Sequence, residues 1–462
     1  MSDYIADDSG PDAEPIERFE QLLEHFERGA KPRASWRIGT EYEKVAVDAR
    51  TGAAVPFSGP RGIEALLRGL ADEFGWEPHD EEGRVIALKR GDGEITLEPG
   101  GQVELSGRQC ETLHEAHAEL QNHIDEIGRI GGRLGITFLG LGIQPFSTLD
   151  QIEWVPKKRY AIMAPYMAKV GSLGQRMMKQ TATVQVNIDY ESEADAMAKM
   201  RVAMGIGPII NAIFANSPIV DGKATGFATY RSHIWTDTDN ARCGILPFVF
   251  NPRAGFADYI EWALDVPMYF IKRRGQYLDL TGIRFRDYWK NGHHGTRATV
   301  GDFALHLSTL FPEVRLKTYI ELRMADSQRP ELLLALSALA KGAFYTPDCL
   351  EAAWDLVKDW SLEERHRVQR EAYRLALDVP LRRFRLGDLA KELLEIAEDG
   401  LKRQRCLDAR GENETVYLAR ARDHVRRGKA PGTIIAERWE GEWHREPARL
   451  IAHTAYSPPS ES

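Results

Sequence analysis

The chain has 462 residues, 43% of them hydrophobic, so it can bury a large core in one big domain or in two closely packed ones. The formal net charge of −9 argues against a general nucleic-acid binder, which would present a basic face. The acidic N-terminus lacks the apolar segment of a signal peptide, and no apolar run is long enough to span a membrane. The four cysteines show no CxxC spacing, which disfavours structural zinc and favours a reduced, cytoplasmic protein.

The first hundred residues contain a pair of acids in a strand pattern. Residues 1–13 are expected to form a disordered acidic tail, and residues 14–28 have the apolar spacing of a helix. In the strand predicted over residues 36–48, Glu41 and Glu43 stand two positions apart and therefore point to one face, which Val45 and Val47 continue. This pattern fits a half-buried acidic site, and it also fits a solvated strand end.

A second pair of acids flanks a predicted turn. A helix over residues 62–74 and one or two strands over residues 85–97 lead into the segment 98–107. Pro99 restricts φ, and the two glycines that follow can adopt the positive φ of a tight turn, so Glu98 and Glu104 can face one site from either side. Because an unpaired buried carboxylate is costly, a bound cation is the expected reason for such a pair.

The middle of the chain contains a strand with one polar face. Helices are expected over residues 111–135 and 160–169, and a strand over 136–143. Within residues 177–190 polar and apolar side chains alternate strictly, with Gln185 and Asn187 on the polar face and Val184 and Val186 on the other. An ordinary antiparallel strand with a solvated face explains this pattern, and so does the floor of a ligand site.

The remaining polar patterns contain arginines. A helix over residues 194–215 precedes a segment, 230–250, in which Arg231 and Arg242 could bind a carboxylate or a phosphate. A further helix is expected over 256–271 and a strand over 314–326, where Tyr319, Glu321 and Arg323 share one face. Glu321 and Arg323 fit a cation ligand beside a phosphate clamp, or a cross-strand ion pair. Residues 330–427 are nearly all helical in pattern, and a polar tail is expected over 456–462.

Together these strands predict an acidic floor. A curved antiparallel sheet backed by helices would bring five carboxylates onto one concave face: Glu41, Glu43, Glu98, Glu104 and Glu321. Ligands that are all oxygen suit Mg²⁺ or Mn²⁺, and several such ions indicate a polyphosphate, most simply ATP. No Walker-A or kinase glycine-rich sequence is present, so metals and sheet side chains would hold the nucleotide.

Five motifs carry a resemblance to a known family. They cover residues 38–44 (IGTEYEK), 97–107 (LEPGGQVELSG), 177–187 (MMKQTATVQVN), 238–244 (TDNARCG) and 319–326 (YIELRMAD). Over nearly its whole length the chain resembles the plant and proteobacterial type of glutamate–cysteine ligase.

This resemblance implies an α+β fold in a single catalytic domain over residues 14–455, with a glutamine-synthetase-like antiparallel sheet that forms a funnel. It implies ATP-dependent joining of L-glutamate to L-cysteine through a γ-glutamyl phosphate, the first step of glutathione synthesis, in a cytoplasmic monomer or homodimer without nucleic-acid or membrane partners. The five acids are then implied as magnesium ligands, with Glu98, Glu321 and Arg323 catalytic. The implied nucleotide contacts are Gln185, Asn187 and Arg323, and the implied substrate contacts are Arg231, Trp235, Arg242, Met178 and Tyr319.

Two other functions stay open at this point. One is a related carboxylate–amine ligase with a different amine acceptor. The other is a non-catalytic binding protein on the same scaffold, which the loss of a metal-binding acid would favour; all five acids are present.

Overall fold

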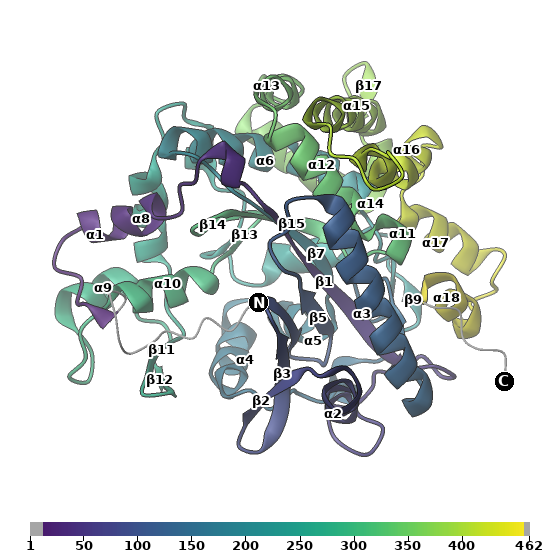
Figure 1. Ribbon diagram of the computed structural model, residues 1–462, viewed down its shortest axis with the longest axis horizontal. Helices are drawn as coiled ribbons and strands as arrows, with labels where there is room; N and C mark the ends of the chain where they lie inside the picture. The colour runs from purple at the N-terminus through teal and green to yellow at the C-terminus, as the bar shows by residue number, and fades with distance from the viewer. Residues whose placement is uncertain (1–12, 457–462) are drawn as a thin grey trace.

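The computed structural model describes residues 13–456, and its centre is a nine-stranded antiparallel sheet (Figure 1). The strand order is β14-β15-β7-β1-β5-β4-β3-β2, and β6 pairs with the far half of β1. The strands are β1 (Ile38–Asp48), β2 (Glu77–Glu81), β3 (Arg84–Arg90), β4 (Gly93–Leu97), β5 (Val103–Ser106), β6 (Ile136–Leu139), β7 (Thr183–Ile188), β14 (Val314–Leu316) and β15 (Ile320–Asp326). The predicted tails lie outside the described residues except at Ala13 and Tyr456.

Strand β1 pairs with β5, β6 and β7 at the centre of this sheet. One of its faces carries polar side chains, and the other packs against helices. Its register places Glu41 opposite Gln185 of β7 and Glu43 opposite Glu104 of β5, so these polar side chains share one face. The alternate residues point backward: the hydroxyl of Thr40 lies 2.8 Å from that of Ser337 in α12. The expected alternation is therefore confirmed.

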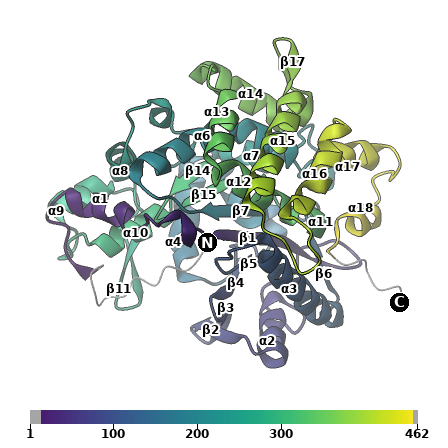
Figure 2. The same cartoon turned by 45° about the horizontal axis from the view of Figure 1, so that its top comes forward.

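Helices cover the back of the sheet. Figures 1 and 2 show α3, α6 and α12 alongside its strands, with α13, α14 and α15 in a further layer. The longer helices are α1 (Glu20–Glu27), α2 (Ile63–Phe74), α3 (Leu113–Leu134), α4 (Lys158–Val170), α5 (Gly174–Gln180), α6 (Glu193–Ile213), α8 (Phe256–Asp265), α9 (Phe285–Asn291), α10 (Val300–Ser308), α12 (Ala335–Phe344), α13 (Pro347–Asp355), α14 (Leu362–Leu375), α15 (Leu386–Gln404), α16 (Ala419–Arg426), α17 (Pro431–Glu440) and α18 (Pro447–Thr454). Short helices are α7 (Tyr230–Ile234) and α11 (Pro330–Leu333), and short strands are β8 (Ile219–Val220), β9 (Lys223–Ala224), β10 (Cys243–Gly244), β11 (Phe270–Arg273), β12 (Gln276–Asp279), β13 (Phe311–Pro312), β16 (Pro380–Leu381) and β17 (Phe384–Arg385).

Three predicted elements were wrong in their extent. The single strand expected over 314–326 is a hairpin, in which β14 turns at residues 317–319 and pairs back with β15. The helix expected over 256–271 ends at Asp265, just before Pro267, whose ring cannot continue it, and Phe270 begins β11. The helix expected over 14–28 begins only at Glu20.

Strand β15 contains one extra residue relative to its neighbour β7. Leu322 pairs with Val186 and Ala325 with Val184, so three steps along β15 match two along β7. This bulge encloses Arg323 and Met324, and it lies at the edge of the polar face.

No helix in residues 13–456 has the length and apolarity needed to cross a bilayer.

Candidate functional site

Three carboxylates from different parts of the sheet converge on its polar face. Glu43 of β1, Glu98 after β4 and Glu104 of β5 each have an oxygen within 4.8 Å of the others. Glu43 and Glu104 are buried, and Glu98 is half-buried. The sequence predicted these acids to share one site, and the structure places these three of the five together.

The Pro-Gly-Gly turn supplies two members of this trio. The turn is closed by hydrogen bonds from the Glu98 N–H to the Gln102 carbonyl (3.0 Å) and from the Gly101 N–H to the Glu98 carbonyl (2.9 Å). Gly101 has φ of +83°, which favours glycine. At Gly100 a Cβ atom would lie 2.1 Å from the Lys179 carbonyl oxygen, so the turn is packed against the end of α5.

Burial and neighbouring acids disfavour the ionisation of two carboxylates on this face, Glu41 and Glu43. Burial, and then the charges of Glu98 and Glu104, raise the pKa of Glu43 well above its ordinary value. Burial, and then the charge of Glu321, raise the pKa of Glu41. The Oε2 atom of Glu41 is buried and has no hydrogen-bond partner among the described residues. A divalent cation would relieve this repulsion, and an all-oxygen donor set fits Mg²⁺ or Mn²⁺.

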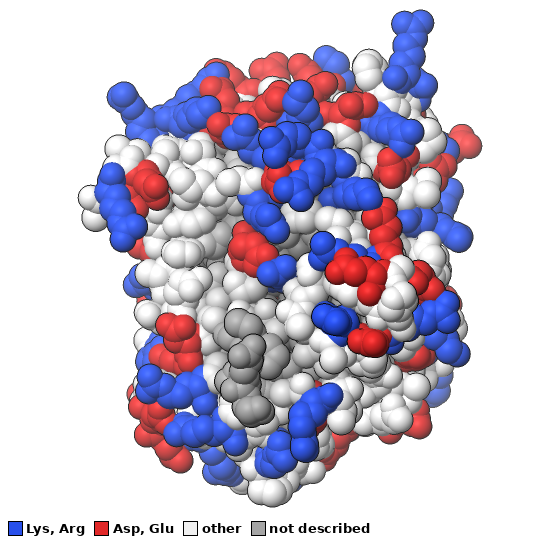
Figure 3. All heavy atoms as spheres, turned by 90° about the vertical axis from the view of Figure 1, so that its right-hand side faces the viewer, with Lys and Arg blue, Asp and Glu red and all other residues white. Residues whose placement is uncertain are grey.

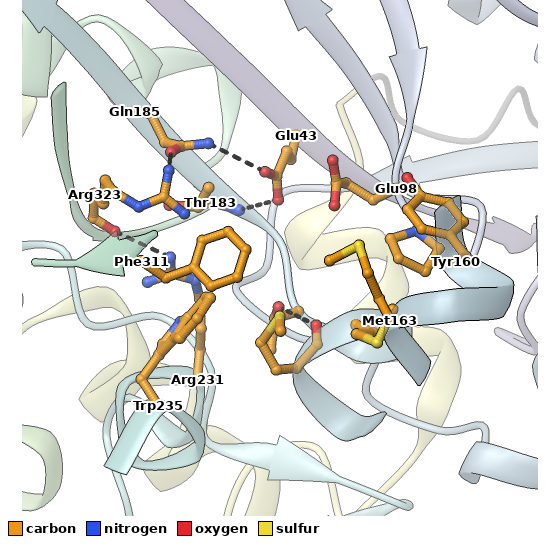
Figure 4. Close-up of a pocket in the computed structure, with 14 residues that line it drawn as sticks. Glu43, Glu98, Tyr160, Met163, Thr183, Gln185, Arg231, Trp235, Phe311 and Arg323 are labelled. Atoms are coloured by element: carbon orange, nitrogen blue, oxygen red, sulfur yellow. Dashed lines mark hydrogen bonds between the residues drawn. The ribbon is translucent and has the colours of Figure 1, made fainter. Parts of the chain in front are cut away.

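Gln185 connects the acids to an arginine. Its Oε1 atom accepts a short hydrogen bond from Nη1 of Arg323, and its Nε2 atom donates to Oε1 of Glu43 at 3.4 Å. The backbone N–H of Thr183 donates to the other Glu43 oxygen at 2.9 Å. Figure 4 shows Arg323 and Gln185 on one side of the pocket, and Glu43 and Glu98 on the other. An amide suits position 185 because its oxygen accepts from a guanidinium while its nitrogen donates to a carboxylate.

A second arginine, Arg231, points into the same pocket from α7. One guanidinium nitrogen donates to the Arg323 carbonyl at 3.0 Å, and another lies 3.8 Å from the Asp326 carboxylate. Asp326 is fixed in turn by the hydroxyls of Ser217 (2.7 Å) and Thr229 (2.9 Å). Arg231 is only 3% exposed, so its charge acts in a poorly solvated place.

Glu321 lies in a network of cations at the edge of the face. Arg315 holds both of its oxygens, at 2.6 and 2.9 Å, and Arg323 lies 2.9 Å away. Burial alone would raise the pKa of Glu321, but Arg315, Lys317 and Arg323 together hold it well below its ordinary value. The Arg315–Glu321 contact is the cross-strand ion pair that the sequence left open, now seen in the β14–β15 hairpin.

Most of the predicted site residues line one of two pockets, and Glu104, Glu321 and Arg242 line neither. The first is lined by Glu43, Glu98, Met178, Gln185, Arg231, Trp235 and Arg323. The second, with a volume of about 550 Å³, is lined by Glu41, Asn187 and Tyr319. Arg242 lines neither pocket; it is buried and bonds to Asp239 and to the carbonyls of Thr309 and Pro267.

Several residues at the site had no predicted role. Tyr160 and Met163 of α4 and Phe311 of β13 line the first pocket, while Arg315 and Asp326 orient its charged groups. Reading residues 317–319 as a hairpin turn would have paired Arg315 with Glu321 across two strands. No local signal marks Tyr160 and Met163, because α4 has an ordinary helical pattern and meets the sheet only through tertiary packing.

Comparison with known proteins identifies relatives over nearly the full chain. The family described as "Glutamate-cysteine ligase family 2 (GCS2)" matches residues 37–453. The chain is 43% identical over 435 residues to glutamate–cysteine ligase B, chloroplastic, of Oryza sativa subsp. japonica, covering 94% of this chain and 86% of that protein. It is 42% identical over 446 residues to the chloroplastic enzyme of Medicago truncatula, covering 96% and 86%.

A solved structure shares the fold at low sequence identity. The chain aligns with a glutamate–cysteine ligase of Francisella tularensis solved in complex with AMP, with a TM-score of 0.54 and 13% identity, over 90% of this chain and 87% of the other. This likeness supports the mixed architecture with a large antiparallel sheet.

Proposed function

The chain belongs to glutamate–cysteine ligase family 2, and on that premise we propose that the polar face of its sheet joins the γ-carboxylate of L-glutamate to the amine of L-cysteine at the expense of ATP, the first step of glutathione synthesis. The proposed catalytic unit is residues 14–455, with the sheet curved into a funnel that opens at this face. The expectations of a cytoplasmic location and of a monomer or homodimer stay predictions.

One observation carries this proposal. Two acids of the trio, Glu43 and Glu98, line one pocket together with two arginines, Arg231 and Arg323. The amide of Gln185 connects the two sets of charges by bonding to Glu43 and to Arg323. Transfer of a phosphoryl group from ATP to a carboxylate brings two anions together, and they repel each other until their charge is neutralised. A cation at the trio and arginines opposite to it would supply this neutralisation.

We assign the metal-binding role first to the trio Glu43, Glu98 and Glu104, and to Glu41 beside them. Mg²⁺ held there would neutralise the phosphate oxygens of ATP and orient them. Glu321, although predicted as a ligand, is better placed to orient Arg323, since both of its oxygens are held by Arg315.

In the first chemical step an oxygen of the glutamate γ-carboxylate attacks the γ-phosphorus of ATP, and ADP leaves. Arg323 faces Glu43 and Glu98 across the pocket (Figure 4) and would contact the transferred phosphoryl group, while Gln185 keeps its guanidinium in place. Arg231, fixed by Asp326, would bind a carboxylate of glutamate. The second pocket, with Asn187 and Tyr319, is large enough for the nucleoside part of ATP.

In the second step the amine of cysteine attacks the acyl carbon, phosphate leaves with the bonding electrons, and the amine loses a proton. Phosphate is a far better leaving group than oxide, which is why the acid must first be activated. The Met178, Trp235 and Phe311 side chains give this pocket an apolar wall that excludes water from the acyl phosphate and suits a small thiol side chain.

The test is a product assay. Purified protein with Mg²⁺ and ATP should release ADP only when glutamate and cysteine are both present, and mass spectrometry should find γ-glutamylcysteine. Other amines in place of cysteine test for a related ligase with another acceptor. If ADP appears without γ-glutamylcysteine, the proposed acceptor is wrong; if no ADP appears under any of these conditions, the proposed ligase activity is refuted.

A further inference from the structure

A cationic cavity lies at the C-terminal side of the molecule, outside the two pockets of the proposed ligase site. We name it the C-terminal cavity; it has a volume of about 100 Å³ and lies among α11, α16, α17 and α18. Its cationic and imidazole side chains are Arg329, Arg420, Arg427, Arg438, His424 and His453. Figure 3 shows this side of the molecule, with lysine and arginine side chains gathered above its centre.

Positive charge exceeds negative charge around this cavity. Its four arginines share three carboxylates, Glu331, Asp423 and Glu442, at distances between 2.9 and 3.7 Å, and Glu331 alone among these acids lines the cavity. The excess acts on His453: burial, and then the charges of Arg329 and Arg438, lower its pKa to about 4. The excess positive charge of the C-terminal cavity therefore attracts an anion.

The floor of the cavity offers acceptors as well. Asn216 and Gln328 are 2% and 1% exposed, and the side-chain oxygen of each is buried with no hydrogen-bond partner among the described residues. Their amide nitrogens are engaged: that of Asn216 donates to two backbone carbonyls at 2.8 Å, and that of Gln328 to the Phe214 carbonyl at 2.7 Å. Because these bonds need N–H donors, neither amide can be flipped, and the oxygens are what remain unsatisfied.

A buried acceptor without a partner costs about 1–3 kcal/mol, so a ligand with a proton to donate would be favoured here. The ligand must therefore accept hydrogen bonds from guanidinium groups and donate at least one to an amide oxygen. A carboxylate or a sulfate at neutral pH accepts only. A phosphate group that keeps one proton does both, and a tetrahedral oxyanion is of a size that suits the cavity.

A phosphate monoester, with its last pKa at about 6, keeps no proton beside arginines at neutral pH, whereas inorganic phosphate keeps one. We propose that the C-terminal cavity binds inorganic phosphate in its hydrogen-phosphate form. The arginines of the rim donate to its unprotonated oxygens, in the charge-assisted geometry that guanidinium groups form with phosphate. Its remaining P–O–H group donates to the oxygen of Asn216 or Gln328.

The test is isothermal titration calorimetry on the full chain without Mg²⁺ or nucleotide, with inorganic phosphate, glycerol phosphate and sulfate as three separate titrants. Inorganic phosphate should bind at one site, and sulfate and glycerol phosphate about tenfold or more weakly, because neither of their anionic groups keeps a proton to donate to the amide oxygens at neutral pH. The absence of phosphate binding, or equal binding of either of the other two titrants, would overturn the proposal.

Variants locate the binding. Arg438→Gln should weaken phosphate binding about tenfold or more, whereas Arg449→Gln, on α18 but outside the cavity, should leave it unchanged. Arg323→Gln should also leave it unchanged, which separates this site from phosphate binding at the ligase pocket. If Arg438→Gln does not fold, Arg420→Gln, whose side chain is 45% exposed, replaces it. Loss of binding in Arg323→Gln with retention in the cavity variants would refute the proposal while leaving the proposed ligase function intact.

Discussion

The Arg315–Glu321 pair makes a prediction that separates two roles for Glu321. The substitution Glu321→Gln keeps the shape of the side chain but removes its charge and replaces one acceptor oxygen by a donor. Arg315, 1% exposed, then loses both of its charge-assisted contacts, at 2.6 and 2.9 Å. It keeps the backbone carbonyls of Ser308 and Leu310 and one neutral amide oxygen as acceptors. Leaving one buried partner of an ion pair uncompensated costs about 3–5 kcal/mol, and the retained acceptors place the expected loss at about 3 kcal/mol.

Two measurements check this prediction. Equilibrium unfolding in urea should show the loss of stability at neutral pH, and Mn²⁺ binding followed by electron paramagnetic resonance should stay unchanged, because Glu321 lies outside the acidic trio. Turnover should fall, since Arg323 loses a partner at 2.9 Å. The matched control is Glu98→Gln, which should unfold within about 1 kcal/mol of the wild type, bind Mn²⁺ weakly, and lose activity at least about a hundredfold.

Either of two results would refute the reasoning. If Glu321→Gln unfolds with unchanged free energy, the ion pair contributes nothing to the stability of the hairpin. If it loses Mn²⁺ binding as Glu98→Gln does, Glu321 is a metal ligand, as the family resemblance implied, and the contacts with Arg315 rearrange when metal binds.

Two further predictions concern the turn and the back of the sheet. Gly100→Ala should destabilise the fold by about 1–3 kcal/mol in urea unfolding, because its Cβ would lie 2.1 Å from the Lys179 carbonyl, whereas Gly132→Ala, with open space on α3, should be neutral or stabilising. Lys44 is buried against His123 at 2.7 Å, and burial lowers its pKa to about 7. The unfolded chain then binds the extra proton between pH 7 and the ordinary lysine pKa, so the stability of the wild type relative to Lys44→Met should rise with pH across this range. A flat difference would show that Lys44 keeps its charge when folded.

The parts of the site that alternate along one strand could be predicted from sequence. Gln185 and Asn187 fall on one face because the side-chain period of a strand is two, and Glu41 and Glu43 follow the same rule. The Pro-Gly-Gly turn was also predictable, since few residues other than glycine adopt the φ of Gly101.

Contacts that depend on strand pairing were harder to predict. The β14–β15 hairpin turns at Lys317, Thr318 and Tyr319, none of which is a typical turn residue, so the segment resembles one continuous strand. Without the turn, the partner of Glu321 could not be identified, and an ion-paired acid was indistinguishable from a free metal ligand. The burial of Arg242 outside both pockets could not be predicted for a related reason: its partner Asp239 is close in sequence, but burial is a tertiary property.

The bulge in β15 has a consequence for how this segment can vary in length. Glu321 and Asp326 are an odd number of positions apart, so in a regular strand they would point to opposite sides of the sheet. The bulge between Leu322 and Ala325 accommodates one extra residue. Glu321, which lies opposite Asn187, and Asp326, which lies opposite Thr183, therefore point to the same side of the sheet. Deleting Met324 would leave them four positions apart, so β15 could pair regularly with β7 and keep both carboxylates on this side, whereas inserting one residue would turn the Asp326 carboxylate away from Arg231. The number of residues in this strand is therefore restricted in one direction, and a one-residue deletion within the bulge should be tolerated better than a one-residue insertion.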